Sequence, residues 1–116
     1  MEIKSVKDIK LTAGYMHDSE FGVEDFGFDS EKKIFHLKSH SPDTGEDFYL
    51  EFYNVEMYDP RNLDKVRKGK GLYGVFNTIK LRSKGLKLIL LSQDLHIVLR
   101  LSEIGGKLEI VTCTGN

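Results

Sequence analysis

Glycines in the spacing G-x-G-x-x-G, which bring backbone amides close to a pyrophosphate, run from Gly69 to Gly74. In a dinucleotide-binding fold this motif follows a strand and opens a helix. Here a short helical turn is expected before it and a strand-like segment, Val75 to Arg82, follows it. A kinase glycine loop is excluded because 116 residues leave no room for the other kinase motifs. We therefore interpret the motif as a bulged loop and expect no cofactor.

Histidine is the second residue type that could do chemistry, as a metal ligand. The chain has four, and two of them, His36 and His40, share one face of an expected strand. At about 3.3 Å per residue they lie about 13 Å apart, which is too far for one metal ion. Because Cys113 is the single cysteine, no zinc-ligand set of the usual spacing exists, and we expect no metal site.

The polar run His17-Asp18-Ser19 precedes the first expected strand and has two interpretations. As a structural element, Asp18 or Ser19 accepts backbone N–H bonds in a turn, and His17 bridges to a neighbouring strand. As a functional element, the run contacts a partner or belongs to a small active site. The chain has no G-x-S-x-G elbow, and Cys113 has no activating neighbour in sequence. We expect no catalytic residues and no enzyme activity.

Charge is divided into two blocks, although the formal net charge is -1. Residues 11–60 contain twelve acidic residues against three lysines, a net charge of -9. Residues 61–90 contain nine basic residues against Asp64, a net charge of +8. Three interpretations stay open: the blocks neutralise each other across strands, the acidic block faces a basic protein, or the basic block binds nucleic acid.

The elements that must position these residues are strands, because period-two alternation is the strongest pattern in the chain. Between Leu95 and Leu101 the odd-numbered residues are apolar and face one side, whereas His96, Val98 and Arg100 face the other. Residues 86–91 are nearly all apolar, which predicts a strand that has both faces covered or lies centrally in its sheet. We expect strands at 23–28, 33–39 and 47–57, followed by a four-stranded meander from 73 to 113.

Seven strands with short connections predict one all-β domain over residues 1–116. We expect an antiparallel meander that forms a small sandwich, a strongly curved sheet or a partly open barrel, with at most one or two short helical turns. One turn is expected over 59–67, with Asp59 as N-cap and Pro60 at the first helical position. Residues 1–12 fit a short helix or an edge element, and a shift of the apolar phase predicts a bulge near Asn54 that could carry the chain between two sheets.

Composition places the chain among ordinary intracellular domains. At this length about two-thirds of the surface is buried on folding, so a core forms without disulfide bonds or metal ions to stabilise it. The single cysteine makes no intramolecular disulfide, and Met1 to Lys10 contain no apolar run of the signal-peptide type. No stretch reaches the length that a membrane-spanning helix needs. We expect a cytoplasmic protein without membrane association.

Three segments occur in a familiar order. They are Tyr15-Met16-His17-Asp18-Ser19-Glu20, then Asp29-Ser30-Glu31-Lys32-Lys33, then Phe48-Tyr49-Leu50-Glu51-Phe52-Tyr53-Asn54-Val55. In this order and over residues 15–55 the chain resembles small bacterial all-β proteins of the immunity-protein-fifty type and their uncharacterised relatives. The resemblance implies a cytosolic bacterial protein that binds and neutralises a toxin. Residues 59–74 depart from that pattern.

Together, the acidic block and the resemblance favour a non-enzymatic, immunity-like module that binds a basic protein, the toxin. The residues expected at its interface are His17, Asp18, Glu20, Glu24, Asp25 and Asp29. The alternative hypothesis is a nucleic-acid-binding module, whose affinity would fall steeply with salt. Its patch would consist of Arg61, Lys65, Arg67, Lys68, Lys70 and Arg82. Unpaired sheet edges also leave homo-oligomerisation open.

Overall fold

The computed structural model describes residues 1–61, 73–92 and 95–112, which form ten strands, one α-helix and two 3-10 helices. The strands are β1 (Glu2–Ile3), β2 (Glu20–Gly22), β3 (Phe26–Asp29), β4 (Ile34–His40), β5 (Glu46–Phe52), β6 (Val55–Arg61), β7 (Tyr73–Arg82), β8 (Lys87–Ser92), β9 (His96–Leu101) and β10 (Gly106–Thr112). The helices are α1 (Val6–Met16), η1 (Val23–Asp25) and η2 (Ser83–Gly85). All the described strand pairs are antiparallel, which confirms the predicted fold class.

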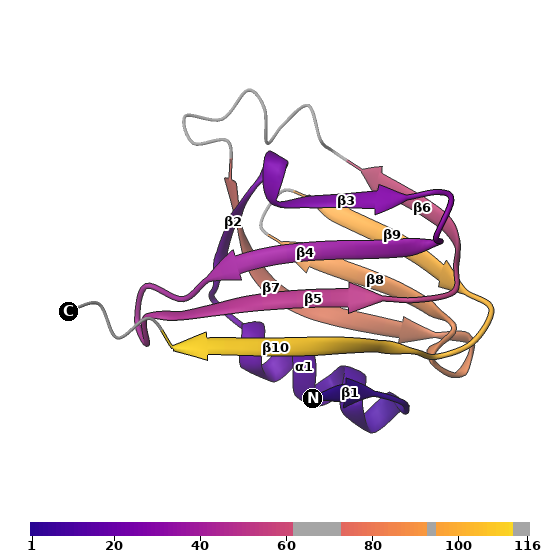
Figure 1. Ribbon diagram of the computed structural model, residues 1–116, viewed down its shortest axis with the longest axis horizontal. Helices are drawn as coiled ribbons and strands as arrows, with labels where there is room; N and C mark the ends of the chain where they lie inside the picture. Colours follow the sequence, from indigo (N-terminus) through magenta and orange to yellow (C-terminus); the bar gives the residue numbers. More distant parts are fainter. Residues whose placement is uncertain (62–72, 93–94, 113–116) are drawn as a thin grey trace.

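The strands follow one hydrogen-bonded path, β1-β10-β5-β4-β2-β7-β8-β9-β6, and β3 pairs with β4 beside it. Figure 1 shows this path folded over on itself, so that β3, β4, β5 and β10 lie in front of β6, β7, β8 and β9. We call the front layer with β1 sheet A and the back layer sheet B. The short strand β2 pairs with both β4 and β7 and links the two layers. The structure is therefore a curved sheet folded into a sandwich, and it does not close into a barrel.

The core lies between the two layers and comes from one face of each strand. Phe35, Phe48 and Phe52 from sheet A, and Leu88 and Leu99 from sheet B, are at most 2 % exposed. In β9 the burial follows the predicted alternation, since Ile97, Leu99 and Leu101 belong to the core cluster. The apolar strand β8 lies centrally between β7 and β9, as predicted.

The two open sides of the sandwich are filled differently. On one side α1 packs beside β7 and β1 and buries Ile9, Ala13 and Met16 (Figure 1). On the other, the Phe28 ring of β3 stacks on the Tyr58 ring of β6 with 5.3 Å between centroids. The alternatives for residues 1–12 are both realised, because β1 is an edge strand and α1 begins three residues after it. At eleven residues α1 is longer than the short helical turns that were expected.

Two local predictions around residues 47–67 need correction. The expected long strand is broken at Asn54, whose backbone is left-handed (φ 58°), so β5 ends at Phe52 and β6 begins at Val55. The chain does cross there between the sheets, and a bulge lies in β6 between Val55 and Met57. Asp59 and Pro60 do not begin a helix but pair with β9, because β6 is a terminal strand of the path and edge strands tolerate proline. Residues 62–67 of the expected turn lie outside the described residues.

Two other strand predictions were wrong in part. β7, β8 and β9 form the predicted meander, but β10 leaves it and pairs with β5 and β1 in sheet A. Gly106 allows this pairing because a Cβ atom there would collide with the carbonyl oxygen of Glu51. The strand expected from residue 23 begins at Phe26, since Val23–Asp25 form η1.

Candidate interaction surface

The outer face of sheet A carries charges that neutralise one another. Lys107 Nζ lies 3.2 Å from Glu51 Oε1 and 3.0 Å from Glu109 Oε1. Hydrogen bonds to Glu109 and Glu51 raise the pKa of Lys107 above its ordinary value. Nearby, Lys38 Nζ lies 5.7 Å from the centroid of the Tyr49 ring. This face therefore presents paired charges around one exposed aromatic ring.

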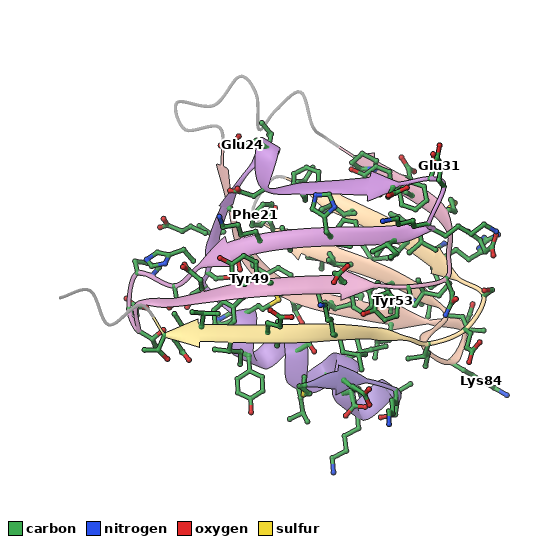
Figure 2. All side chains as sticks on the ribbon, in the orientation of Figure 1. Phe21, Glu24, Glu31, Tyr49, Tyr53 and Lys84 are labelled. Atoms are coloured by element: carbon green, nitrogen blue, oxygen red, sulfur yellow. The ribbon has the colours of Figure 1, made fainter. Side chains whose placement is uncertain are left out.

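The residues expected to bind a basic partner do not form one cluster. His17 and Asp18 follow α1, Glu20 begins β2, Glu24 and Asp25 lie in η1, and Asp29 ends β3. Figure 2 shows Glu24 near one end of β3 and Glu31, two residues after Asp29, near the other end.

Two of these carboxylates hold the local backbone. Asp25 Oδ2 accepts the Gly22 N–H at 2.7 Å. Asp29 Oδ1 accepts the N–H groups of Glu31 and Lys32 at 3.0 and 3.1 Å, which fixes the turn into β4. Both side chains therefore have structural roles that are independent of any partner.

The run His17-Asp18-Ser19 ties α1 to both layers. His17 Nδ1 lies 2.9 Å from the Asn77 carbonyl oxygen, which confirms the predicted bridge to a neighbouring strand. Asp18 adopts a left-handed backbone (φ 66°) just after the helix. The hydroxyl of Ser19 lies 2.6 Å from the Met16 carbonyl oxygen, so it donates there instead of accepting the backbone N–H that was expected.

The outer face of sheet B carries unpaired cations in register. Arg82 of β7 lies opposite Lys87 of β8, and Lys87 lies opposite Arg100 of β9. We call these three residues the basic row. Within the described part of the chain, none of the three forms an ion pair; Arg82 Nη1 donates to the Leu81 carbonyl oxygen at 3.0 Å. Like charges directly opposite each other are destabilising, so folding alone does not explain the arrangement.

Apolar residues lie next to the basic row on the same face. Lys80, Ile89, Val98 and Asp59 are in register across the four strands. Val98 is 2 % exposed yet lies outside the core cluster, because it faces away from the sandwich interior. Beyond it Leu91 pairs with His96, and His96 pairs with Arg61. The face thus combines the buried Val98 and the half-buried Ile89 and Leu91 with basic side chains beside them.

The expected nucleic-acid patch is placed only in part. Arg82 begins the basic row, and Arg61 lies on the same face beside Asp59, with Arg61 Nε 2.8 Å from Asp59 Oδ2. Lys65, Arg67, Lys68 and Lys70 lie outside the described residues. Sequence reasoning missed Arg100, since it lies beyond the basic block. Alternation in β9 did place Arg100 away from the core, but its neighbours depend on strand register.

The two charge blocks meet in one described ion pair, Asp59 with Arg61. The other ion pairs join acidic side chains to cations outside residues 61–90, for example Glu56 to Lys33 and Asp47 to His40. Figure 2 shows the acidic Glu24 and the basic Lys84 at opposite ends of the molecule. Among the described residues, ion pairs between the two blocks therefore account for Arg61 but not for the three cations of the basic row.

Among residues 1–61, 73–92 and 95–112 there is no group of three His, Cys, Asp or Glu side chains placed to hold a metal ion. In the same residues no helix has the length and apolar character needed to cross a membrane. Comparison with known proteins finds no matching family model, no matching curated protein and no matching solved structure.

Proposed function

We propose that this protein is a non-enzymatic binding module that binds an acidic protein through the outer face of sheet B. The basic row carries the proposal: Arg82, Lys87 and Arg100 lie side by side across three strands, and none of them forms an ion pair within the described chain. An acidic partner would relieve their repulsion, and the relief would add to the binding free energy.

The composition of this face supports a protein partner over nucleic acid. Protein interfaces combine an apolar centre with a polar rim, which matches the half-buried Ile89 and Leu91 beside the basic row. Surfaces that bind single strands use aromatic side chains to stack bases. The described outer-face positions of β8 and β9 contain no Phe, Tyr or Trp. The formal net charge of -1 also differs from the strongly basic character typical of nucleic-acid-binding domains.

The toxin-binding hypothesis from the family resemblance stays a prediction, as does its basic partner. The geometry gives it less support, because Asp25 and Asp29 hold backbone N–H groups of their own chain. A cytoplasmic location and self-association through sheet edges likewise stay predictions.

Three labelled polymers distinguish the hypotheses by fluorescence anisotropy: poly-glutamate, poly-lysine and a single-stranded oligothymidine. The proposal predicts that poly-glutamate binds, and that its affinity falls when sodium chloride rises from about 50 to 300 mM, because salt screens exposed charges. Preferred binding of poly-lysine would favour the toxin-binding hypothesis, in which the acidic residues contact a basic partner. Preferred binding of the oligonucleotide would favour the nucleic-acid hypothesis. Either result would overturn the proposal.

A pair of charge-reversal variants locates the site. Lys87→Glu with Arg100→Glu removes two cations of the basic row, and Lys32→Glu with Lys38→Glu changes the net charge equally on sheet A. We expect the first variant to weaken poly-glutamate binding at least tenfold and the second to weaken it less than twofold. Equal losses would mean that only net charge matters.

A further inference from the structure

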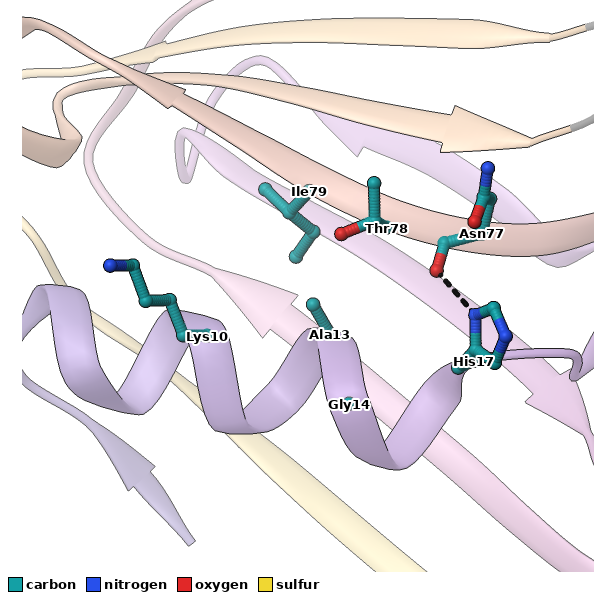
Figure 3. A pocket seen from close by; sticks show the side chains of 7 residues that line it. All are labelled: Lys10, Ala13, Gly14, His17, Asn77, Thr78 and Ile79. Atoms are coloured by element: carbon teal, nitrogen blue, oxygen red, sulfur yellow. Dashed lines mark hydrogen bonds between the residues drawn. The ribbon is translucent and has the colours of Figure 1, made fainter.

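A groove runs between α1 and β7, at the β7 edge of sheet B. It consists of two adjoining cavities of about 420 and 540 Å³, which share Lys10 and Ile79. Figure 3 shows its first part, with Ala13 pointing from α1 toward β7 and His17 closing one end against Asn77. The second part continues past Leu81 to the turn at η2. Because α1 lines it from Val6 to His17, the groove is about 16 Å long at 1.5 Å per residue.

The lining of the groove has one sign of charge. Lys10, Arg82 and Lys84 line it, and so does His17, whereas no lining residue is a carboxylate. Among the described ion pairs, these side chains take part in one, between His17 Nε2 and Asp18 Oδ1 at 3.4 Å. The buried Ala13 and Ile79 and the half-buried Leu81 form the apolar floor between the cations. An occupant that alternates acidic and apolar side chains would match this lining.

The backbone of β7 adds a second feature to the groove. β2 pairs with β7 only up to Val75, and Phe76 makes the last backbone bonds on that side, with Asp18 and Ser19. From Asn77 to Arg82 no described strand pairs with this edge of β7, and α1 lies beside it. α1 therefore protects this edge of β7 from pairing with another strand, and the two elements form the two walls of the groove.

We propose that the groove between α1 and β7 binds an extended acidic segment of the protein partner. At about 3.3 Å per residue, five residues of an extended chain span the groove. Glutamate or aspartate side chains on that segment would face Lys10 and Lys84. Arg82 lines the groove and also begins the basic row, so the two surfaces are continuous. This inference rests on the proposed function, because it names the part of the acidic partner that enters.

A labelled hexapeptide that alternates glutamate and valine tests the groove, with a glutamine-valine hexapeptide as its neutral control. We expect the acidic peptide to bind at least tenfold more tightly than the neutral one. Lys10→Glu with Lys84→Glu should weaken its binding at least tenfold, whereas Lys32→Glu with Lys38→Glu should weaken it less than twofold. Amide exchange should slow at residues 78–82 when the peptide is present. All four lysines are exposed, and circular dichroism checks that each variant folds.

The outcomes separate this inference from the proposed function. Equal binding of the two peptides would overturn the proposal that the groove binds an acidic segment. An equal loss of peptide affinity in the two double-lysine variants would overturn it as well. Loss confined to Lys87→Glu with Arg100→Glu would also overturn it, while supporting the basic row. If the hexapeptide fails to bind but poly-glutamate binds through the basic row, the groove proposal fails and the proposed function stands. If neither acidic probe binds, both proposals fail.

Discussion

Lys87 and Arg100 lie directly opposite each other on neighbouring strands of sheet B, and both face away from the core. Cross-strand neighbours of like charge repel, and Arg82 on the other side of Lys87 extends the same repulsion to a third strand. This repulsion lowers the stability of the free protein, and a bound anion would offset it. The repulsion among these three cations therefore affects both the stability of sheet B and its proposed binding of an acidic partner.

Reversing the central charge should stabilise the free protein. Lys87→Glu places a carboxylate between Arg82 and Arg100, and we expect the free energy of unfolding to rise by about 0.2 to 1 kcal/mol, the usual size of a cross-strand pair. Urea titration at low and high salt measures this change, which should shrink as salt screens the charges. Lys38→Glu is the control, because Lys38 lies on sheet A opposite Tyr49 and gains no cationic cross-strand partner. A similar gain in both variants would contradict the explanation.

A pair of buried hydroxyls should show coupling. Ser19 Oγ lies 2.6 Å from the Met16 carbonyl oxygen and 2.9 Å from Ser39 Oγ, so its one proton goes to the carbonyl and it accepts from Ser39. We expect Ser19→Ala to cost about 1 to 3 kcal/mol, because it leaves the Ser39 hydroxyl buried without a partner. The double variant should cost less than the sum of the single variants in a thermodynamic cycle. Additive costs would show that the two hydroxyls do not interact.

Two glycines should respond in opposite ways to alanine. In Gly106→Ala the new Cβ meets the carbonyl oxygen of Glu51, so β10 cannot keep its place beside β5. Gly14 lies within α1 with no atom within 4 Å of an added Cβ, and Gly14→Ala should stabilise by about 0.5 to 1 kcal/mol through helix propensity. Thermal unfolding compares the two. A Gly106→Ala protein as stable as the wild type would disprove this account of the β5–β10 pairing.

Acid should weaken the start of α1 through Asp8. Asp8 Oδ2 accepts the Lys4 N–H at 2.9 Å, and this bond lowers the pKa of Asp8 below its ordinary value of 3.8. A lowered pKa in the folded state stabilises the fold above the unfolded value, and this contribution is lost as the pH falls through the folded value.

Asp8→Asn should therefore lose less stability than the wild type between about pH 5 and pH 2. Denaturant titration at several pH values measures the difference. Ser5→Ala serves as a comparison, since it removes the N-cap bond to Asp8 N–H and a smaller cause of the lowered Asp8 pKa but keeps the larger one, the bond from Lys4 N–H. We expect its cost, about 0.5 to 2 kcal/mol, to be present at neutral pH as well. A wild type and an Asp8→Asn variant with parallel acid curves would refute the assignment.

Local patterns in the sequence were sufficient to predict much of the fold. Alternation identified β9 with its inward leucines and outward Arg100, and the apolar run identified β8 as central. The phase shift near Asn54 marked the place where the chain changes sheets. It did not distinguish a bulge from a break, because both leave the same pattern of apolar residues.

The candidate site was predicted less well, because it depends on which strands are neighbours. The basic block included Arg82 and Lys87, but Arg100 joins them only through the register of β8 with β9. The acidic residues were grouped because they are close in sequence, whereas Asp25 and Asp29 serve separate turns. The groove was not predicted, since α1 and β7 lie about sixty residues apart and nothing local relates them.

By itself, the sequence determined the period of each strand, the faces that become buried, and the separation of acidic from basic residues along the chain. These properties follow from side chains two or four residues apart, so they need no knowledge of the rest of the molecule. Only the tertiary structure decided that β10 leaves the meander for β5, that α1 lies beside β7, and that three cations share a row. Those choices depend on contacts between distant segments, which the whole core must satisfy at once.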